Sequence, residues 1–243
     1  MLYMTREERL IKLENMSNTR DLGGYETRQG TYTKSHQFIR GASTSDASLN
    51  DLKTLYDYGI RTIIDLRSDY EKVKEPDLFA NYKGVEYVEI NLFQQSKASV
   101  VPENISNFKG LGGLYIYLLE ASKEPIKNVF KVLLRYPKGI LFHCSAGKDR
   151  TGVIAALLLE LAGCYKEDIV KDYSESYENN LSINNHLKDM MEKEHDSYLT
   201  SAPEYMIEFL DYLYENYGSS QQYLLEIGLS NLEISEIIEN FTI

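Results

Sequence analysis

Cys144 and Arg150 are the two residues whose types and spacing could do chemistry together, with five residues between them. A deprotonated cysteine is a strong nucleophile, and an arginine presents a planar fork of N–H donors that fits two oxygens of a phosphate group. The fork can follow those oxygens into a trigonal transition state, where its hydrogen bonds strengthen. The pair therefore predicts attack of sulfur on a phosphate ester, with Cys144 as nucleophile and Arg150 as phosphate clamp.

The stretch around this pair, GILFHCSAGKDRTG from 139 to 152, predicts the elements that such chemistry needs. A short apolar strand leads into a polar loop, and the next helix, 149–161, is apolar on almost every face and is therefore expected to be buried. Loop amides and the unpaired N–H groups of a helix start can converge on one phosphate and favour the thiolate. The residues predicted to bind phosphate are Ser145, Ala146, Gly147, Lys148, Asp149 and Arg150.

The pattern His-Cys, any five residues, Arg and then Thr resembles the cysteine-based protein tyrosine phosphatase superfamily. The form HCSAGKDRTG is most similar to bacterial tyrosine phosphatases that also accept phosphoserine, phosphothreonine or phosphoinositides; the stretches NTRDLGGY (18–25), IRTIIDLRS (60–68) and DIVKDYS (168–174) agree with it. The resemblance implies a phosphatase for phosphotyrosine monoesters, with a cysteinyl-phosphate intermediate and no cofactor. It also implies a tyrosine-phosphatase-like α/β fold, a sheet flanked by helices.

Four further residues are predicted to support the reaction. His143 is expected to hydrogen-bond the loop backbone and hold its shape, and Thr151 completes the motif. Arg20 and Asp21 are expected to lie beside the phosphate loop, where they would orient it or meet the substrate. The alternative for their stretch is a simple turn, because Asp and Gly are turn formers.

The usual general acid of the family, an Asp on a separate mobile loop, is missing, because no Asp occurs from 78 to 148. The resemblance implies Asp149 instead, since the same position in some cysteine-based lipid phosphatases is proposed to be the acid. Asp65, at the end of a predicted strand, is the alternative. Asp77 lies in a charged stretch, 67 positions before the cysteine. A helix start and a neighbouring arginine favour the ionised form of Asp149, so we expect an activity optimum on the acidic side of neutral.

Other functions remain open at this point. A phosphoinositide phosphatase is favoured by Lys148, since an added cation suits substrates with several phosphates, although the net charge of −11 opposes docking on anionic membranes. A module that only binds phosphorylated partners would need a broken nucleophile or clamp, and both are intact. A nucleotide P-loop is excluded, because Phe142 and Asp149 occupy its Gly and its Ser or Thr positions.

Composition limits the compartment and the partners. The 243 residues are 43% hydrophobic and 26% charged, typical of a globular domain, and a net charge of −11 opposes nucleic-acid binding. Two cysteines, Cys144 and a structural Cys164, suit a reducing compartment. The first residues lack the apolar block of a signal, and no run approaches the roughly 20 apolar residues of a membrane span. A cytoplasmic protein is expected, with signal-independent export and oligomeric state left open; the histidines show no metal-ligand spacing.

Apolar runs and helical periodicity predict one α/β domain over 1–243. We expect a core over 1–175, which carries the phosphate loop at 143–151, and a helical extension or lid over 176–243. The stretch GLGG at 110–113 is expected to be a loop that enters a helix. Strands are expected at 38–39, 60–65, 85–90 and 139–142, and helices at 48–58, 114–122, 127–136, 149–161, 203–214, 221–227 and 231–240.

Overall fold

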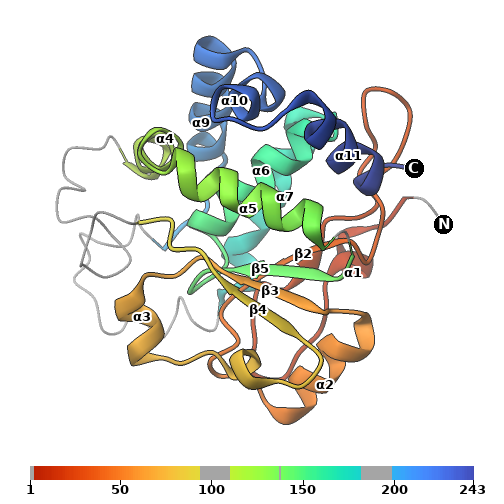
Figure 1. Cartoon of the computed structure of the whole chain (residues 1–243), viewed down its shortest axis with the longest axis vertical. Coiled ribbons are helices and arrows are strands. Elements are labelled where there is room, and N and C mark those ends of the chain that lie inside the picture. The colour runs from red at the N-terminus through yellow and green to blue at the C-terminus, as the bar shows by residue number, and fades with distance from the viewer. Residues whose placement is uncertain (1–2, 94–109, 137, 182–198) are drawn as a thin grey trace.

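The computed structural model describes residues 3–93, 110–136, 138–181 and 199–243 (Figure 1). Its centre is a five-stranded sheet with the strand order β1-β2-β5-β3-β4. Four strands run parallel, and β1 pairs antiparallel with β2 at one edge. The α/β prediction is confirmed, and the strands are β1 (Arg20–Asp21), β2 (Phe38–Gly41), β3 (Thr62–Asp65), β4 (Glu86–Glu89) and β5 (Ile140–His143).

Strand β5 lies at the centre of the sheet although it is the last strand in the sequence. Its final residue, His143, is in register with Gly41 at the end of β2 and with Asp65 at the end of β3. Because parallel strands end at the same edge, the loop after β5 is flanked by the segments that follow β2 and β3. This edge is where ligands bind in open α/β sheets.

Both faces of the sheet are covered, which explains why its central strands are continuous apolar runs. Helix α2 (Leu49–Tyr58) packs Leu52 and Leu55 against one face, where they meet Leu141 of β5. The neighbouring Phe142 points to the opposite face and joins the larger core. Burial of each such side chain contributes about 1.5–3 kcal/mol, so β5 is anchored from both sides immediately before the phosphate loop.

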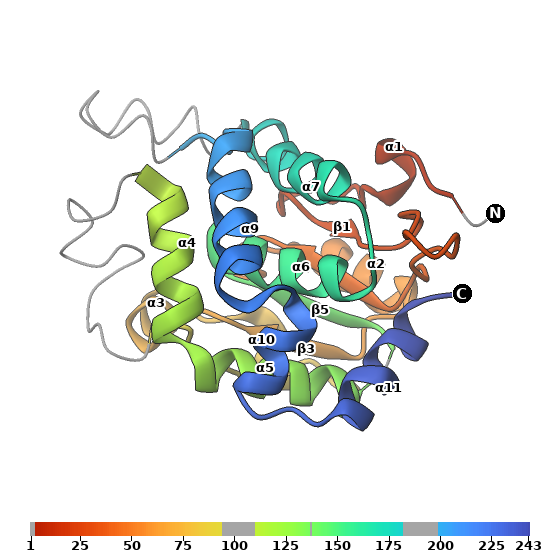
Figure 2. The same ribbon diagram turned by 90° about the horizontal axis from the view of Figure 1, so that it is seen from above.

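The other face is covered by most of the helices (Figure 1). Helix α6 (Asp149–Leu161) is central, and all its residues from Arg150 onward are buried, as its apolar sequence predicted. Figure 2 shows α9 lying between α4 and α7. The helices of this layer are α4 (Gly110–Ala121), α5 (Lys123–Arg135), α6, α7 (Lys166–Asn179), α9 (Pro203–Tyr217), α10 (Ser220–Glu226) and α11 (Asn231–Phe241).

Helix α4 corrects one prediction, because it begins at Gly110 and the expected loop at 110–113 is helical. Gly112 lies at a close contact between α4 and α9, whereas Gly110, the first residue of the helix, has a left-handed φ of +75°. A Cβ added at Gly112 would lie 2.1 Å from a carboxylate oxygen of Glu208 in α9. A side chain at this position would force the Glu208 side chain to move.

Besides the two-residue strand β1, four short or polar elements were not predicted. They are α1 (Arg6–Arg9), α3 (Asp69–Lys74), the 3₁₀ turn η1 (Leu78–Asn81) and α7. The proposed border between core and extension, 175/176, falls inside α7, and the division into core and lid stays a prediction. In the part of the chain described here, no helix combines the length and apolarity needed to cross a membrane.

Candidate active site

The phosphate loop runs from the end of β5 to the start of α6, and its carbonyl groups point outward. Cys144 is 2% exposed at its start. The carbonyl oxygens of residues 144 to 147 are each held by donors from the surrounding protein. These donors are His143 Nδ1 at 3.1 Å, Ser43 N at 2.9 Å, Asn18 Nδ2 and Asn180 Nδ2 at 2.9 Å each, and Arg40 Nη2 at 2.8 Å.

This outward anchoring determines where the loop amides point. In a trans peptide the C=O and the following N–H point in opposite directions, so anchored carbonyls turn the amides of 145 to 148 toward the inside of the loop. Converging amides of this kind form an anion-binding nest. Phosphate binding by the residues from Ser145 to Arg150 stays a prediction.

Gly147 allows the loop to pass close to β2. Its φ of +65° lies in the left-handed region, and a Cβ added there would lie 2.3 Å from the carbonyl oxygen of Gly41. A substitution would therefore add backbone strain and a collision with a strand. The loop path depends on this glycine.

Arg150 is held by Glu71 of α3, a residue that the sequence patterns did not identify. Both terminal nitrogens of the guanidinium lie 2.7 Å from the two carboxylate oxygens, and Ser145 Oγ donates to the same carboxylate at 2.6 Å. Phe93 lies against the guanidinium, with 5.3 Å between Cζ and the ring centre. A guanidinium gripped at its end fork still offers the Nε side to a ligand.

Glu71 is fixed as an anion. Burial opposes its ionisation, but the hydrogen bonds and charge of Arg150, with further hydrogen bonds from Ser145 and Ser68, lower the pKa of Glu71 to about 2. The same carboxylate accepts from the amide and hydroxyl of Ser68, and so caps α3 while it holds the arginine. The start of helix α3 and the position of the Arg150 guanidinium are therefore fixed by the same carboxylate.

Asp149, the first residue of α6, accepts a hydrogen bond from a tyrosine of α4. Tyr115 Oη donates to Asp149 Oδ1 at 2.6 Å, and the hydroxyl of Tyr173 in α7 lies 2.6 Å from that of Tyr115. Lys148 Nζ lies 3.6 Å from the same Oδ1 and 3.0 Å from the carbonyl oxygen of Thr200. The Asp149 side chain is 23% exposed, so this carboxyl is the partly open one beside the loop.

A family model described as the tyrosine phosphatase family matches residues 11–243 of this sequence. The chain belongs to this family. A tyrosine-protein phosphatase of Nostoc commune is 32% identical over 215 residues, which cover 82% of this chain and 72% of that protein. The triple specificity protein phosphatase PtpB of Mycobacterium tuberculosis is 30% identical over 43% of this chain and 44% of its own length.

A solved structure adds one further comparison. The crystal structure of P. aeruginosa TpbA in complex with pTyr aligns with 74% of this chain and 88% of that chain, at a TM-score of 0.39 and 13% identity. The family resemblance predicted from HCSAGKDRTG is thus confirmed by the family match over most of the sequence. The chain is a tyrosine phosphatase.

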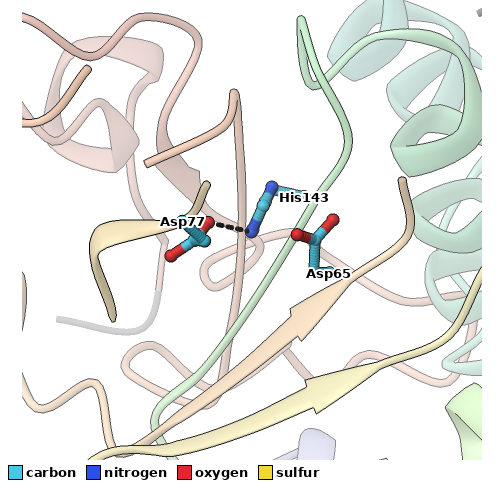
Figure 3. Close-up of side chains that lie close together, drawn as sticks. All are labelled: Asp65, Asp77 and His143. Carbon is cyan, nitrogen blue, oxygen red and sulfur yellow. Dashed lines mark ion pairs between the residues drawn. The ribbon is translucent and has the colours of Figure 1, made fainter. Parts of the chain in front are cut away.

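Behind the phosphate loop of this phosphatase lies a buried cluster of Asp65, Asp77 and His143 (Figure 3). Asp77 Oδ2 lies 3.1 Å from His143 Nε2. Asp65 accepts from three nitrogen atoms of Arg67, its main-chain N, Nε and Nη2, and from the hydroxyl of Tyr87. The Asp65 carboxylate is therefore paired with the Arg67 guanidinium inside the protein and does not face the open side of the phosphate loop.

The cluster balances its own charge. Both ring nitrogens of His143 face acceptors, the Cys144 carbonyl and the Asp77 carboxylate, so both are placed to carry protons. Burial disfavours the charged ring, but Asp65 and Asp77 together raise the pKa of His143. When His143 is protonated, two carboxylates face two cations, Arg67 and His143. These ligand atoms lie within 4.8 Å of one another, yet a metal ion would compete with the arginine already bound there.

The NTRDLGGY stretch lies beside the loop, and Asn18 makes its direct contact. Asn18 has a left-handed φ of 55°, which asparagine tolerates, and donates to the Ala146 carbonyl. Arg20 is buried behind it, donating to the Asn18 carbonyl at 3.2 Å and to Asp172 of α7 at 2.9 Å. Asp21 turns away and accepts from Gly23 N, His36 N and Tyr58 Oη.

Asp172 connects Arg20 of this stretch to a second arginine that contacts the loop. It also pairs with Arg40, the residue that holds the Gly147 carbonyl. Burial opposes ionisation of Asp172, but Arg20 and Arg40 hold its pKa well below the ordinary value. The stretch DIVKDYS thus contains a residue that supports the phosphate loop, and it lies behind the loop.

The remaining predicted residues have the following positions. The hydroxyl of Ser145 serves the clamp through Glu71, and the buried hydroxyl of Thr151 has no hydrogen-bond partner within the described ranges. Cys164 is buried, which raises the pKa of its thiol to about 12. The sequence patterns missed four residues that meet the loop from distant segments, Arg40, Glu71, Tyr115 and Asn180.

Proposed function

We propose that this phosphatase hydrolyses phosphotyrosine monoesters through a phosphocysteine on Cys144. The observation that supports this most is the outward anchoring of the loop carbonyls, which turns the amides inward in front of a nucleophilic cysteine. Arg150 closes the site as the phosphate clamp, gripped at one end by Glu71. Amides and a guanidinium are the donors that stabilise charge developing on phosphate oxygens.

The proposed reaction has two steps. In the first, the Cys144 sulfur forms a bond to phosphorus as the bond to the ester oxygen breaks, and Asp149 gives that oxygen its proton. In the second, water attacks phosphorus, the bond to sulfur breaks, and Asp149 takes a proton from the water. The thiolate and the protonated Asp149 are thereby restored.

An aryl phosphate is the proposed substrate, with phosphoserine, phosphothreonine and phosphoinositides as the alternatives. The relative named a triple specificity phosphatase gives a reason to test all of them. Lys148 was the feature that favoured phosphoinositides, but its ammonium group donates to the Thr200 carbonyl. A panel of phosphopeptides and phosphoinositides, compared by kcat/KM, separates these substrates.

The nucleophile is tested by Cys144→Ser, with Cys164→Ala as the matched control. Cys144→Ser should lose turnover of nitrophenyl phosphate but still bind inorganic phosphate in calorimetry, because the amides and Arg150 remain. Cys164→Ala should keep turnover, since that thiol is buried and its pKa is about 12. Residual turnover of Cys144→Ser above about one percent, well beyond what a nucleophile loss leaves behind, would exclude the assignment. The clamp is tested in parallel by Arg150→Lys, expected to lose at least ~100-fold.

A cytoplasmic location is proposed on the state of the two cysteines. Cys144 and Cys164 are both free thiols. A reducing compartment keeps such thiols available for chemistry. Fractionation of cells with an antibody against the chain tests the location.

A further inference from the structure

The partly exposed Asp149 is connected to two buried tyrosines from outside the phosphate loop. Tyr115 of α4 donates to its Oδ1, and Tyr173 of α7 meets Tyr115, with 2.6 Å at each link. The two rings pack edge to face at 5.6 Å, and both side chains are at most 1% exposed. The hydroxyls are therefore fixed by packing and have few alternative partners.

The chain of hydroxyls has a direction. A tyrosine hydroxyl has one proton to donate, and Tyr115 uses it on Asp149. Tyr173 must then donate to the Tyr115 oxygen. Burial, followed by the negative charge of Asp149, raises the pKa of both Tyr115 and Tyr173 well above the ordinary value, so both remain O–H donors.

We infer that Tyr115 is a positioning residue for Asp149, because its hydroxyl reserves Oδ1 as an acceptor and so assigns the transferable proton to Oδ2. The inference rests on the proposed role of Asp149 as general acid. Lys148 Nζ lies farther from Oδ1, at 3.6 Å, and donates to the Thr200 carbonyl at 3.0 Å. In the first step the Oδ2–H bond breaks as the proton joins the ester oxygen, and in the second the proton from water returns to Oδ2.

This device suits a carboxyl that must gain and lose a proton in each turnover. A neutral hydroxyl can remain bonded to Oδ1 whether the carboxyl is charged or protonated. A full cation in the same place would strongly oppose the protonated form. Helices α4 and α7 thus act on the chemistry through one hydrogen-bonded oxygen.

The test is Tyr115→Phe, assayed with two aryl phosphates that differ in leaving group. Loss of one hydrogen bond of this kind corresponds to about tenfold in rate, and we expect that loss in kcat/KM and kcat for phenyl phosphate, with KM nearly unchanged. Nitrophenolate leaves with little protonation, so the loss with nitrophenyl phosphate should stay below about threefold, as general-acid catalysis requires. Equal losses on both substrates would contradict the inference.

A matched control removes another buried hydroxyl from the same helix layer. Tyr223 is fully buried and donates to the Leu119 carbonyl at 2.7 Å, at the far end of α4. Tyr223→Phe should lower both rates equally or not at all. A leaving-group dependence in Tyr223→Phe as large as that in Tyr115→Phe would show that general loosening of α4 is responsible.

A double variant separates this inference from the proposed function. In an Asp149→Asn background, Tyr115→Phe should cause no further leaving-group dependence, because it acts only through Asp149. If Asp149→Asn itself affects both leaving groups equally, the general-acid assignment fails, although an inactive Cys144→Ser would still support the phosphatase. If Asp149→Asn discriminates and Tyr115→Phe does not, only the positioning role of Tyr115 is wrong.

Discussion

Two groups of carboxylates border the phosphate loop and are partnered in opposite ways. Behind the loop, Asp65 and Asp77 face Arg67 and His143 in a buried cluster (Figure 3). At the start of α6, the shortest contact of Asp149 is with a neutral tyrosine hydroxyl, and its side chain is partly exposed. The residue types are the same, but their partners differ.

Given the proposed role of Asp149, the difference separates carboxylates that hold the structure from a carboxyl that transfers protons. Burial opposes ionisation of Asp65, yet His143 and Arg67 lower its pKa far below the ordinary value. A carboxylate fixed in this way holds its neighbours in place but cannot exchange a proton near neutral pH. A carboxyl bound by a hydroxyl can serve both proton states, which is what acid and base catalysis requires.

The largest effect is expected where the buried ion pairs are broken. Asp172→Ala should lower the free energy of unfolding by about 3–5 kcal/mol, because Arg40 would lose its buried ion pair and Arg20 would keep only the Glu175 carboxylate at 3.8 Å. The measurement is urea unfolding near neutral pH. Asp211→Ala is the control, since Asp211 forms a half-exposed pair with Lys166 and such pairs contribute about 0–1 kcal/mol. A loss as small as that of the control would mean that Asp172 is not essential to this support.

The next effect concerns the clamp. Glu71→Gln should lower kcat/KM by about 10–100-fold, because charge-assisted hydrogen bonds contribute about 1.5–3 kcal/mol and here they orient Arg150. The control is Glu89→Gln, which alters the exposed partner of Lys72, a neighbour of Glu71 in α3. The kcat/KM of this variant should be close to that of the wild type. Unchanged activity of Glu71→Gln would show that packing against Phe93 is enough to hold the guanidinium.

A smaller effect distinguishes the two candidate acids. Asp65→Asn should reduce activity by roughly tenfold or less, on the scale of one lost hydrogen bond, and equally for nitrophenyl and phenyl phosphate. Asp149→Asn should cost more with phenyl phosphate. The measurement is kcat/KM with both substrates. If Asp65→Asn lowered the hydrolysis of phenyl phosphate more than that of nitrophenyl phosphate, and Asp149→Asn did not, Asp65 would be the general acid in place of Asp149.

Sequence reasoning succeeded where the interactions are local. The strand before Cys144, the loop and the helix from 149 to 161 follow from contiguous residues, and the predicted helix agrees with α6 at both ends. Thirteen consecutive residues with few polar groups leave little choice but a buried helix. The roles expected of Cys144 and Arg150 from their spacing are likewise local inferences, and they stay predictions.

The same reasoning failed where partners come from far along the chain. Glu71 meets Arg150 across 79 residues and Tyr115 meets Asp149 across 34. Neither shows a local pattern, since Glu71 reads as one acid in a charged helix and Tyr115 as one of 20 tyrosines. Strand β1 has only two residues and α3 only six, so both are too short for a repeating apolar pattern to be detected.

The smallest predicted effect is a pH dependence of stability from His143 and Asp77. Burial and Arg67 disfavour the charged ring of His143, but Asp65 and Asp77 raise its pKa above 6.5. The charged ring therefore stabilises the fold below about pH 6.5, and this contribution is lost as pH rises through the folded pKa. Against the opposing effect of burial, His143 and Thr44 lower the pKa of Asp77 below 3.8, so its contribution is lost only in acid.

Asp77→Asn should therefore be most destabilising between about pH 4 and 6.5, and the deficit should shrink at higher pH. The amide oxygen can keep the hydrogen bonds from Thr44 and Phe79 N, and at high pH its NH₂ can donate to a neutral His143 ring. The expected deficit is about 1.4 kcal/mol for each unit by which the pair raises the pKa of His143. Urea unfolding at several pH values measures it, with Asp57→Asn at an exposed pair as control. A deficit that stays constant as pH rises through neutrality would show that the contribution of Asp77 does not depend on a charged His143 ring.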